Sequence, residues 1–148
     1  MKHLNSEVII MGKKLTVIQN ERKRPKQSEN ILYIPVSFDE HALRVYLRMR
    51  LRRIIKSEFS KLSSSGKFYL VGEIDFELVK NFRDKSIISM LKGSTILVRE
   101  DTIKLSRVDI REILVHELAH IFSSHHDEKF LMAMRYIGGK QRRLPIQL

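Results

Sequence analysis

Two histidines and a glutamate near the C-terminus have the types and spacing of a metal-dependent hydrolase. The segment His116-Glu117-Leu118-Ala119-His120 has the pattern H-E-x-x-H. Histidines four residues apart lie on one face of a helix, so both imidazoles can reach one zinc ion. Glu117 can then serve as general base on a water held by that zinc. The pattern predicts a catalytic metal site, provided that the segment is helical.

The residues around the motif have the character of an amphipathic helix. Ser106 can serve as the N-cap, and Asp109 three residues later reinforces this start. The apolar residues that would pack the helix against a sheet recur at helical spacing, at Ile110, Leu114, Leu118 and Ile121. The alternative is a pair of ordinary helix histidines, one of them partly buried and hydrogen-bonded. The helical context and a third nearby histidine favour the metal site.

That third histidine follows after a short break in the helix. His126 lies six residues after His120, and His125 lies five after it, so a continuing helix would carry both away from the metal. We expect the helix to stop at Ser123-Ser124, because serine has weak helix propensity and bonds readily to backbone groups. We favour His126 as the ligand, because Asp127 and a helix beginning there can hold it at the metal, and His125 remains the alternative. Three protein ligands leave a fourth position open, as in catalytic zinc sites.

The step of six residues between histidines also occurs in metzincins, whose pattern is H-E-x-x-H-x-x-G-x-x-H. Ser123 stands where that pattern has glycine, so a metzincin is a poor match. The helix expected after Asp127 ends at Gly138-Gly139. Its apolar residues at helical spacing are Phe130, Ala133, Met134 and Ile137.

Length and composition limit the classes of protein to consider. A chain of 148 residues can form one domain with a real core, so we expect a single domain over residues 1–148. It has no cysteine, which excludes disulfides and cysteine-based zinc sites. No apolar run approaches the length of a membrane span, and the first residues lack a secretory pattern. We therefore expect a cytoplasmic protein with no membrane partner.

The chain is strongly basic, with a net charge of +11 and a pI near 10.1. Such a charge attracts polyanions, nucleic acid among them. The most concentrated basic surface predicted lies on a long helix, where Arg44, Arg48, Arg52 and Lys56 follow at intervals of four. Like charges stacked in this way repel by roughly 0.2–0.5 kcal/mol per pair. A bound nucleic acid would offset that repulsion, as would acidic groups from elsewhere in the fold, and a merely solvated face is the third possibility.

The N-terminal half is expected to hold strands and then this long helix. Residues 1–30 contain a strand hairpin turning at Gly12-Lys13, followed by a basic loop over residues 20–30, and residues 31–36 form a further strand. Ser37 and Glu40 have the spacing of a capping box. The helix that follows is expected to run to about Leu62.

The C-terminal half is expected to add strands before the H-E-x-x-H helix. Strands are predicted over residues 68–71 and 74–79, and a hairpin over 86–91 and 94–99 turns at Lys92-Gly93. Residues 138–148 form a basic tail. The order of elements indicates an α+β domain, with a small, mostly antiparallel sheet packed with a long helix and the H-E-x-x-H helix.

The order of elements and the C-terminal motifs resemble the YgjP-like minimal metallopeptidases, relatives of the SprT-like and WLM zinc proteases. Members of that group have a helix ending H-E-L-x-H, followed by Asn-His-x-x-x-Phe. Residues 115–120 match the first motif and His126 to Phe130 match the second, with His125 in place of the asparagine. Where the group has a Trp-Gly-Ser-Cys-like turn, this chain has Ile87-Ile88-Ser89-Met90.

The resemblance implies a zincin-like hydrolase that cleaves polypeptides. It carries over His116, His120 and His126 as ligands of Zn²⁺ and Glu117 as the catalytic glutamate. It also implies that the strand from Ser94 to Arg99 is an edge strand forming the wall of the cleft. SprT-like and WLM relatives include proteases that digest proteins crosslinked to DNA, and the net charge fits action on nucleic-acid-associated proteins.

Three points remain open in the sequence. The alternative function is a nucleic-acid-binding module with a structural or vestigial zinc site. Glu117 argues against this alternative, because a structural site needs no carboxylate beside the metal. Tyr136 and Arg135 are guesses for the group that stabilises the oxyanion. Glu112, one turn before the first histidine, either orients a ligand or faces solvent, and solvent is the simpler expectation.

Overall fold

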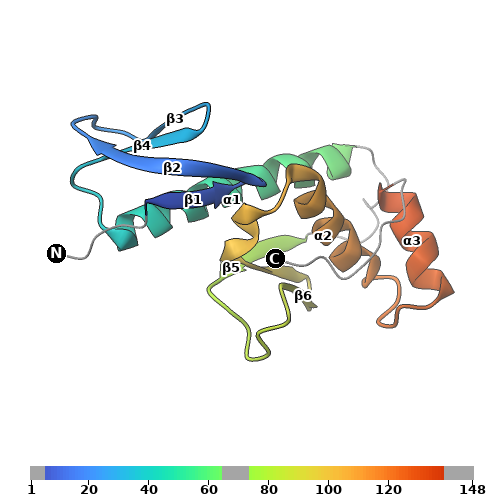
Figure 1. Cartoon of the computed structure of the whole chain (residues 1–148). Coiled ribbons are helices and arrows are strands. Elements are labelled where there is room, and N and C mark those ends of the chain that lie inside the picture. The colour runs from blue at the N-terminus through green and yellow to red at the C-terminus, as the bar shows by residue number, and fades with distance from the viewer. Residues whose placement is uncertain (1–5, 65–73, 139–148) are drawn as a thin grey trace.

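The structure is a computed structural model, and it describes residues 6–64 and 74–138. A four-stranded sheet lies beside the N-terminal part of a long helix, α1 (Glu40–Ser64). Helix α3 (Glu128–Gly138) lies toward the other end of α1 (Figure 1). Between them are a three-stranded sheet and α2 (Arg107–Ala119), which carries the H-E-x-x-H motif. The α+β class expected from the sequence is confirmed.

The first sheet contains four strands in the order β1-β2-β4-β3. Its strands are β1 (Glu7–Ile10), β2 (Lys13–Asn20), β3 (Lys26–Ser28) and β4 (Ile31–Pro35). The β1–β2 hairpin turns at Met11-Gly12, where both φ angles are positive, at 52° and 79°. Such angles suit a tight two-residue hairpin turn and explain the glycine. The expectation of a loop over residues 20–30 was wrong in part, because β3 lies within it and pairs with β4.

Helix α1 begins later than the predicted capping box. The backbone N–H of Ala42 donates to Oδ1 of Asp39 at 2.8 Å, so Asp39 caps the helix, and the Ser37–Glu40 box is wrong. The helix then continues two residues beyond Leu62. Its buried face carries four apolar residues and one glutamate, namely Leu51, Ile54, Ile55, Leu62 and Glu58.

The second sheet contains three strands in the order β5-β7-β6. Its strands are β5 (Asp75–Val79), β6 (Ser89–Lys92) and β7 (Thr95–Arg99). The predicted hairpin of residues 86–99 is present as β6 and β7, whereas the strand expected over 68–71 lies outside the described residues. The expected single sheet is two sheets, each with one parallel pairing, β2 with β4 and β5 with β7. Because β7 lies between β5 and β6, the expectation that Ser94 to Arg99 forms an edge strand was wrong.

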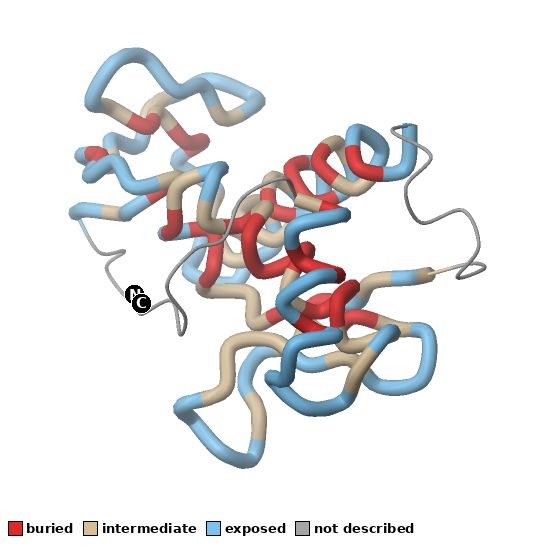
Figure 2. Tube along the Cα trace, turned by 90° about the vertical axis from the view of Figure 1, so that its right-hand side faces the viewer, coloured by how far each residue is buried: buried red, intermediate tan, exposed pale blue. Residues whose placement is uncertain are grey.

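The core includes buried residues of β1, β2 and β4 and continues to where α2 contacts α1, α3 and strand β6. Figure 2 shows buried residues along the inner faces of the helices and the strands beside them. A short 3₁₀ helix, η2 (Glu100–Lys104), leads from β7 into α2. Helix α3 closes tightly on α2, since a Cβ on Gly138 would lie 2.9 Å from the side chain of Val115. None of the helices within the described residues combines the length and apolar composition needed to cross a bilayer.

Candidate metal centre

Helix α2 presents the motif as the sequence predicts. The hydroxyl of Ser106 accepts the backbone N–H of Asp109 at 3.2 Å, which confirms the N-cap. Three of the four residues of the predicted apolar stripe, Ile110, Leu114 and Leu118, are buried, whereas Ile121 lies beyond the end of the helix and is partly buried. This packing fixes the rotation of the helix about its axis, and therefore the direction in which its two histidines project.

Three imidazoles converge beyond the end of α2. Nε2 of His120 lies 3.2 Å from Nε2 of His116 and 3.3 Å from Nε2 of His126. The potential ligand atoms of these three residues all lie within 4.8 Å of one another, close enough to hold one metal ion. Zinc bound tetrahedrally at about 2.0–2.1 Å places its nitrogen ligands roughly 3.3 Å apart, which these distances match. The favoured set from the sequence therefore meets at one point, whereas His125 is exposed and outside the cluster.

The return of the chain to the site depends on a network of hydrogen bonds after α2. The helix ends at Ala119, earlier than the predicted stop, and His120 is its C-cap. The hydroxyl of Ser123 donates to Oδ2 of Asp127 at 2.9 Å, and Oδ1 of Asp127 accepts the N–H of Phe130 at 3.0 Å. Asp127 is thus the N-cap of α3 and holds the turn that carries the third histidine.

A buried phenylalanine supports all three rings. The ring centroid of Phe130 lies 4.9 Å from that of His116, 4.7 Å from that of His120 and 4.8 Å from that of His126. Phe130 is only 2% exposed, so it forms an apolar floor that restricts the movement of the imidazoles. The sequence indicates Phe130 as a core residue of α3 and as the phenylalanine of the second motif of the resembling group, but helical spacing carries no information about which neighbours it meets.

The protonation of the cluster suits a bound cation. The carbonyl of Ser123 can only accept, so Nδ1 of His120, 3.1 Å away, carries the proton and leaves Nε2 bare toward the cluster. Burial lowers the pKa of His116 to about 4, and the charges of His120 and His126 add to this effect. His116 is therefore neutral near pH 7, the form in which imidazole binds metals.

The second ring nitrogen of His116, Nδ1, lies in the protein interior. Nδ1 of His116 is buried and has no hydrogen-bond partner among the described residues, so no hydrogen bond there fixes the ring orientation as the Ser123 carbonyl does for His120. Glu112 lies one turn earlier on α2 and is only 6% exposed. The expectation that Glu112 faces solvent was therefore wrong, because the helix is buried on more sides than its apolar stripe indicates.

The glutamate of the motif lies in the interior, against strand β6. Glu117 is 4% exposed, and its Oε2 accepts the hydroxyl of Ser89 at 2.5 Å. The backbone N–H of Leu91 also bonds to this carboxylate. Burial raises the pKa of Glu117 by more than the Ser89 hydroxyl, the charge of His120 and the Leu91 N–H lower it. A carboxylate with a raised pKa is a stronger base, as proton transfer near pH 7 requires.

The two contacts between Glu117 and β6 could not be predicted from the sequence. Ser89 lies 28 residues before Glu117, and no local pattern joins a strand to a helix at that separation. The only signal is the Ser89 position itself, which corresponds to the serine in the Trp-Gly-Ser-Cys-like turn of the resembling group.

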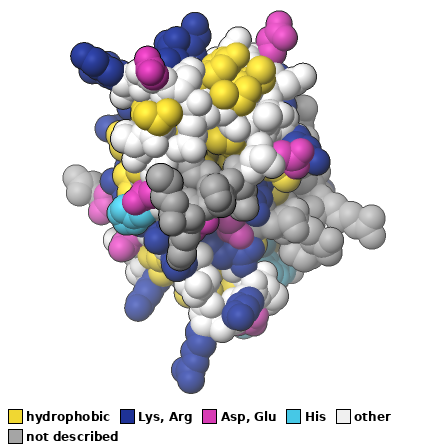
Figure 3. Space-filling view, turned by 60° about the vertical axis from the view of Figure 1, so that its left-hand side comes forward, with side chains coloured by type: hydrophobic (Ala, Val, Ile, Leu, Met, Phe, Trp, Pro, Cys, Tyr) yellow, Lys and Arg dark blue, Asp and Glu magenta, His cyan; other side chains and the backbone are white. Residues whose placement is uncertain are grey.

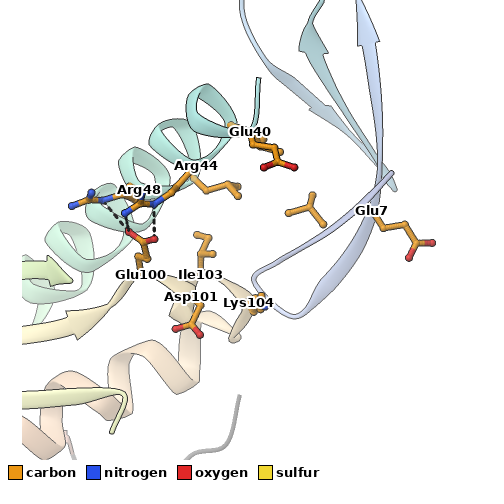
Figure 4. Close-up of a pocket in the computed structure, with 11 residues that line it drawn as sticks. Glu7, Glu40, Arg44, Arg48, Glu100, Asp101, Ile103 and Lys104 are labelled. Carbon is orange, nitrogen blue, oxygen red and sulfur yellow. Dashed lines mark hydrogen bonds and ion pairs between the residues drawn. The ribbon is translucent and has the colours of Figure 1, made fainter. Parts of the chain in front are cut away.

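The predicted basic face on α1 is divided between paired and exposed residues. Nε of Arg44 lies 2.7 Å from Oε1 of Glu100, and Nε of Arg48 lies 3.3 Å from its Oε2. These groups line a pocket of about 340 Å³ with an apolar wall that includes Ile103 (Figure 4). Arg52 and Lys56 are exposed. An acidic group of the fold itself therefore offsets the charge of two of the four basic residues, Arg44 and Arg48. Nucleic-acid binding by this face stays a prediction.

Basic side chains are also distributed over the surface shown in Figure 3, where they alternate with acidic ones.

Tyr136, one guess for the oxyanion-stabilising group, is 57% exposed on α3. Arg135 is exposed on the same helix. The buried face of α3, in contrast, carries Phe130 under the imidazoles.

Comparison with known protein families finds a match in the C-terminal part of the chain. No curated protein and no solved structure matches the chain. Residues 92–147 match the model of the WLM domain, a family of zinc-metalloprotease-like domains. The match covers less than half of the chain, but it contains β7, α2, α3 and all three converging histidines. In this C-terminal part, the chain is therefore similar to WLM domains.

Proposed function

We propose that this protein is a zinc-dependent metallopeptidase. One observation carries the proposal: the imidazoles of His116, His120 and His126 converge closely enough to hold one metal ion, at the end of the helix that also holds the buried carboxylate of Glu117. The similarity to WLM domains supports a metallopeptidase-like function for the same residues. The finer relationship to SprT-like or YgjP-like enzymes rests on the sequence resemblance alone.

The donor set suits zinc. His116, His120 and His126 would hold the ion through neutral imidazoles, and Phe130 would keep their rings in place. Three ligands leave a coordination position for the reaction. Bound there, zinc would supply Lewis-acid chemistry, lowering the pKa of a water to about 7 and polarising the scissile carbonyl.

Glu117 would move the proton. Its carboxylate would accept a proton from the attacking water and pass it to the departing amine. Burial raises its pKa, which strengthens it as a base and lets it hold that proton until the amine leaves. The substrate would be a polypeptide, and because β7 is central, the predicted cleft wall along Ser94 to Arg99 is not proposed again.

A set of four proteins tests the proposal. The wild type should bind one zinc per chain and cleave an unfolded protein. Glu117→Gln should keep the zinc and lose cleavage by at least about 10²-fold, since it removes the base. His120→Ala should lose both.

His125→Ala is the matched control, because His125 is an exposed histidine of the same turn that lies outside the cluster. It should keep full zinc content and activity. Cleavage by Glu117→Gln at the wild-type rate, or full zinc content in His120→Ala, would contradict the proposal.

A further inference from the structure

Strand β6 presents one edge to β7, and no other strand of residues 6–64 and 74–138 pairs with its second edge. Within the part of the chain that the structure describes, it is an outer strand of its sheet. The N–H of Arg99 donates to the carbonyl of Ile88 at 2.8 Å, which sets the alternation along this antiparallel pair. The backbone groups of Ile88 and Met90 thus face β7, and those of Ser89 and Leu91 face the free edge.

The carboxylate of Glu117 occupies this free edge. Its hydrogen bonds include the Ser89 hydroxyl and the Leu91 N–H, two groups that lie two residues apart on β6. Helix α2 contacts β6 along the same side. A helix-borne carboxylate is therefore fastened to the outer strand of the hairpin, which places the hairpin next to the proposed catalytic centre.

We propose that Ser89 is the positioning residue for Glu117. Its hydroxyl fixes Oε2, so that the other carboxylate oxygen is directed toward the proton it transfers. This inference rests on the proposed function. Of the two donors from β6, Leu91 contributes a backbone group that is present whatever its side chain, so Ser89 supplies the contact that a substitution can remove.

The energetic reason is orientation. A glutamate side chain has several rotatable bonds, and catalysis requires its oxygen within hydrogen-bond reach of the transferred proton. A misplacement of about 1 Å costs roughly 10²-fold in rate. Ser89 also precedes the region that matches the WLM model, so the anchor comes from a part of the chain to which that similarity does not extend.

The test compares Ser89→Ala and Ser89→Thr with the control Ser94→Ala. Ser94 is an exposed serine of the β6–β7 turn. Ser89→Ala should lower kcat by about 10- to 100-fold, with KM within about twofold and one zinc still bound. Ser89→Thr keeps the hydroxyl and should restore most of kcat, and Ser94→Ala should match the wild type.

A second readout needs no activity. In the metal-free protein, the Leu91 amide should exchange its hydrogen at least about 10-fold faster in Ser89→Ala than in the wild type, because the carboxylate that protects it is released. Glu117→Ala should produce the same increase. The control Ser94→Ala should leave the Leu91 rate unchanged.

The outcomes separate the two proposals. An active wild type with an equally active Ser89→Ala and an unchanged Leu91 rate would overturn the role of Ser89 alone. That role is also overturned if Ser89→Thr loses as much kcat as Ser89→Ala, or if Ser89→Ala loses its zinc. A wild type that binds zinc but cleaves nothing would instead contradict the proposed function, whatever the exchange rates show.

Discussion

The Nδ1–H of His120 donates to the backbone carbonyl of Ser123, 3.1 Å away, and so fixes which nitrogen of this ring is free to bind a metal. His120 ends the helix, and Ser123 begins the turn that brings His126 back to it. The orientation of the second ligand and the path to the third are therefore set by the same few residues. Loss of a hydrogen-bond partner that orients a metal ligand commonly lowers metal affinity by roughly 10- to 100-fold.

Removing the cap of α3 should weaken metal binding. Asp127 accepts from Ser123 and Phe130, so Asp127→Ala should loosen the turn that carries His126. We expect zinc affinity to fall by about 10- to 100-fold, with a lower melting temperature. A chelator competition titration measures the affinity. Glu128→Gln, a neighbouring exposed acid, is the control, and an unchanged affinity in Asp127→Ala would refute the role of the cap.

Replacing the aromatic floor should affect the site more than the fold. Phe130→Leu removes the ring but keeps an apolar side chain, so the free energy of unfolding should fall by less than the roughly 3–5 kcal/mol that truncation of a buried phenylalanine to alanine costs. Zinc affinity should fall as well, because the three rings lose the surface that orients them. The control is Phe122→Leu, since Phe122 is 47% exposed. Equal zinc affinity in the two variants would contradict the proposed floor.

The ion pair that joins α1 to α2 should give a pH-dependent stability. Glu58 is 3% exposed and accepts from Arg107 and Lys61. Burial alone would raise the pKa of Glu58, but the bonds and charges of Arg107 and Lys61 outweigh it and lower the pKa. The stabilisation is thus full above the unfolded-state pKa of about 4.3 and is lost as pH falls through the lower folded-state value.

Glu58→Gln should therefore destabilise the protein at pH 7 by about 1.5–3 kcal/mol, as expected for hydrogen bonds to a charged group. Urea unfolding at pH 7 and at successively lower pH, below about 4, measures the difference between variant and wild type. That difference should shrink as the wild-type carboxylate is protonated. A constant difference at every pH would show that the charge of Glu58 contributes nothing.

The remaining basic face gives a prediction about nucleic acid. Arg52→Ala and Lys56→Ala should each lower the slope of log binding constant against log salt concentration, for single-stranded DNA, by about 0.7 in magnitude. This is the change expected for the loss of one phosphate contact. Arg44→Ala should change this slope less, because its guanidinium is paired with Glu100. Binding that does not depend on salt would dismiss the surface.

Local features of the site could be predicted from the sequence, and pairings between distant segments could not. The Ser106 cap and the apolar stripe of α2 follow from helical periodicity, and a chain reversal after His120 makes His126 reachable. Strand β3 escaped prediction because its three residues are all exposed and show no alternation. The contact of Ser89 with Glu117 depends on tertiary packing, which the periodicity of the sequence does not predict.

The same limit applies to the sheets and the charges. The central position of β7 depends on its parallel pairing with β5, although β6 lies between these two strands in the sequence. Arg44 meets Glu100 across 56 residues of sequence. At the start of α1, the cap is Asp39, two residues after the predicted Ser37.

X-ray absorption at the zinc edge tests the central claim most directly. The zinc-loaded wild type should show three imidazole ligands at about 2.0–2.1 Å and one oxygen ligand from water. His126→Ala should show two imidazoles, and His125→Ala should still show three. Three imidazoles in His126→Ala, or fewer than three in the wild type, would contradict a centre built from His116, His120 and His126.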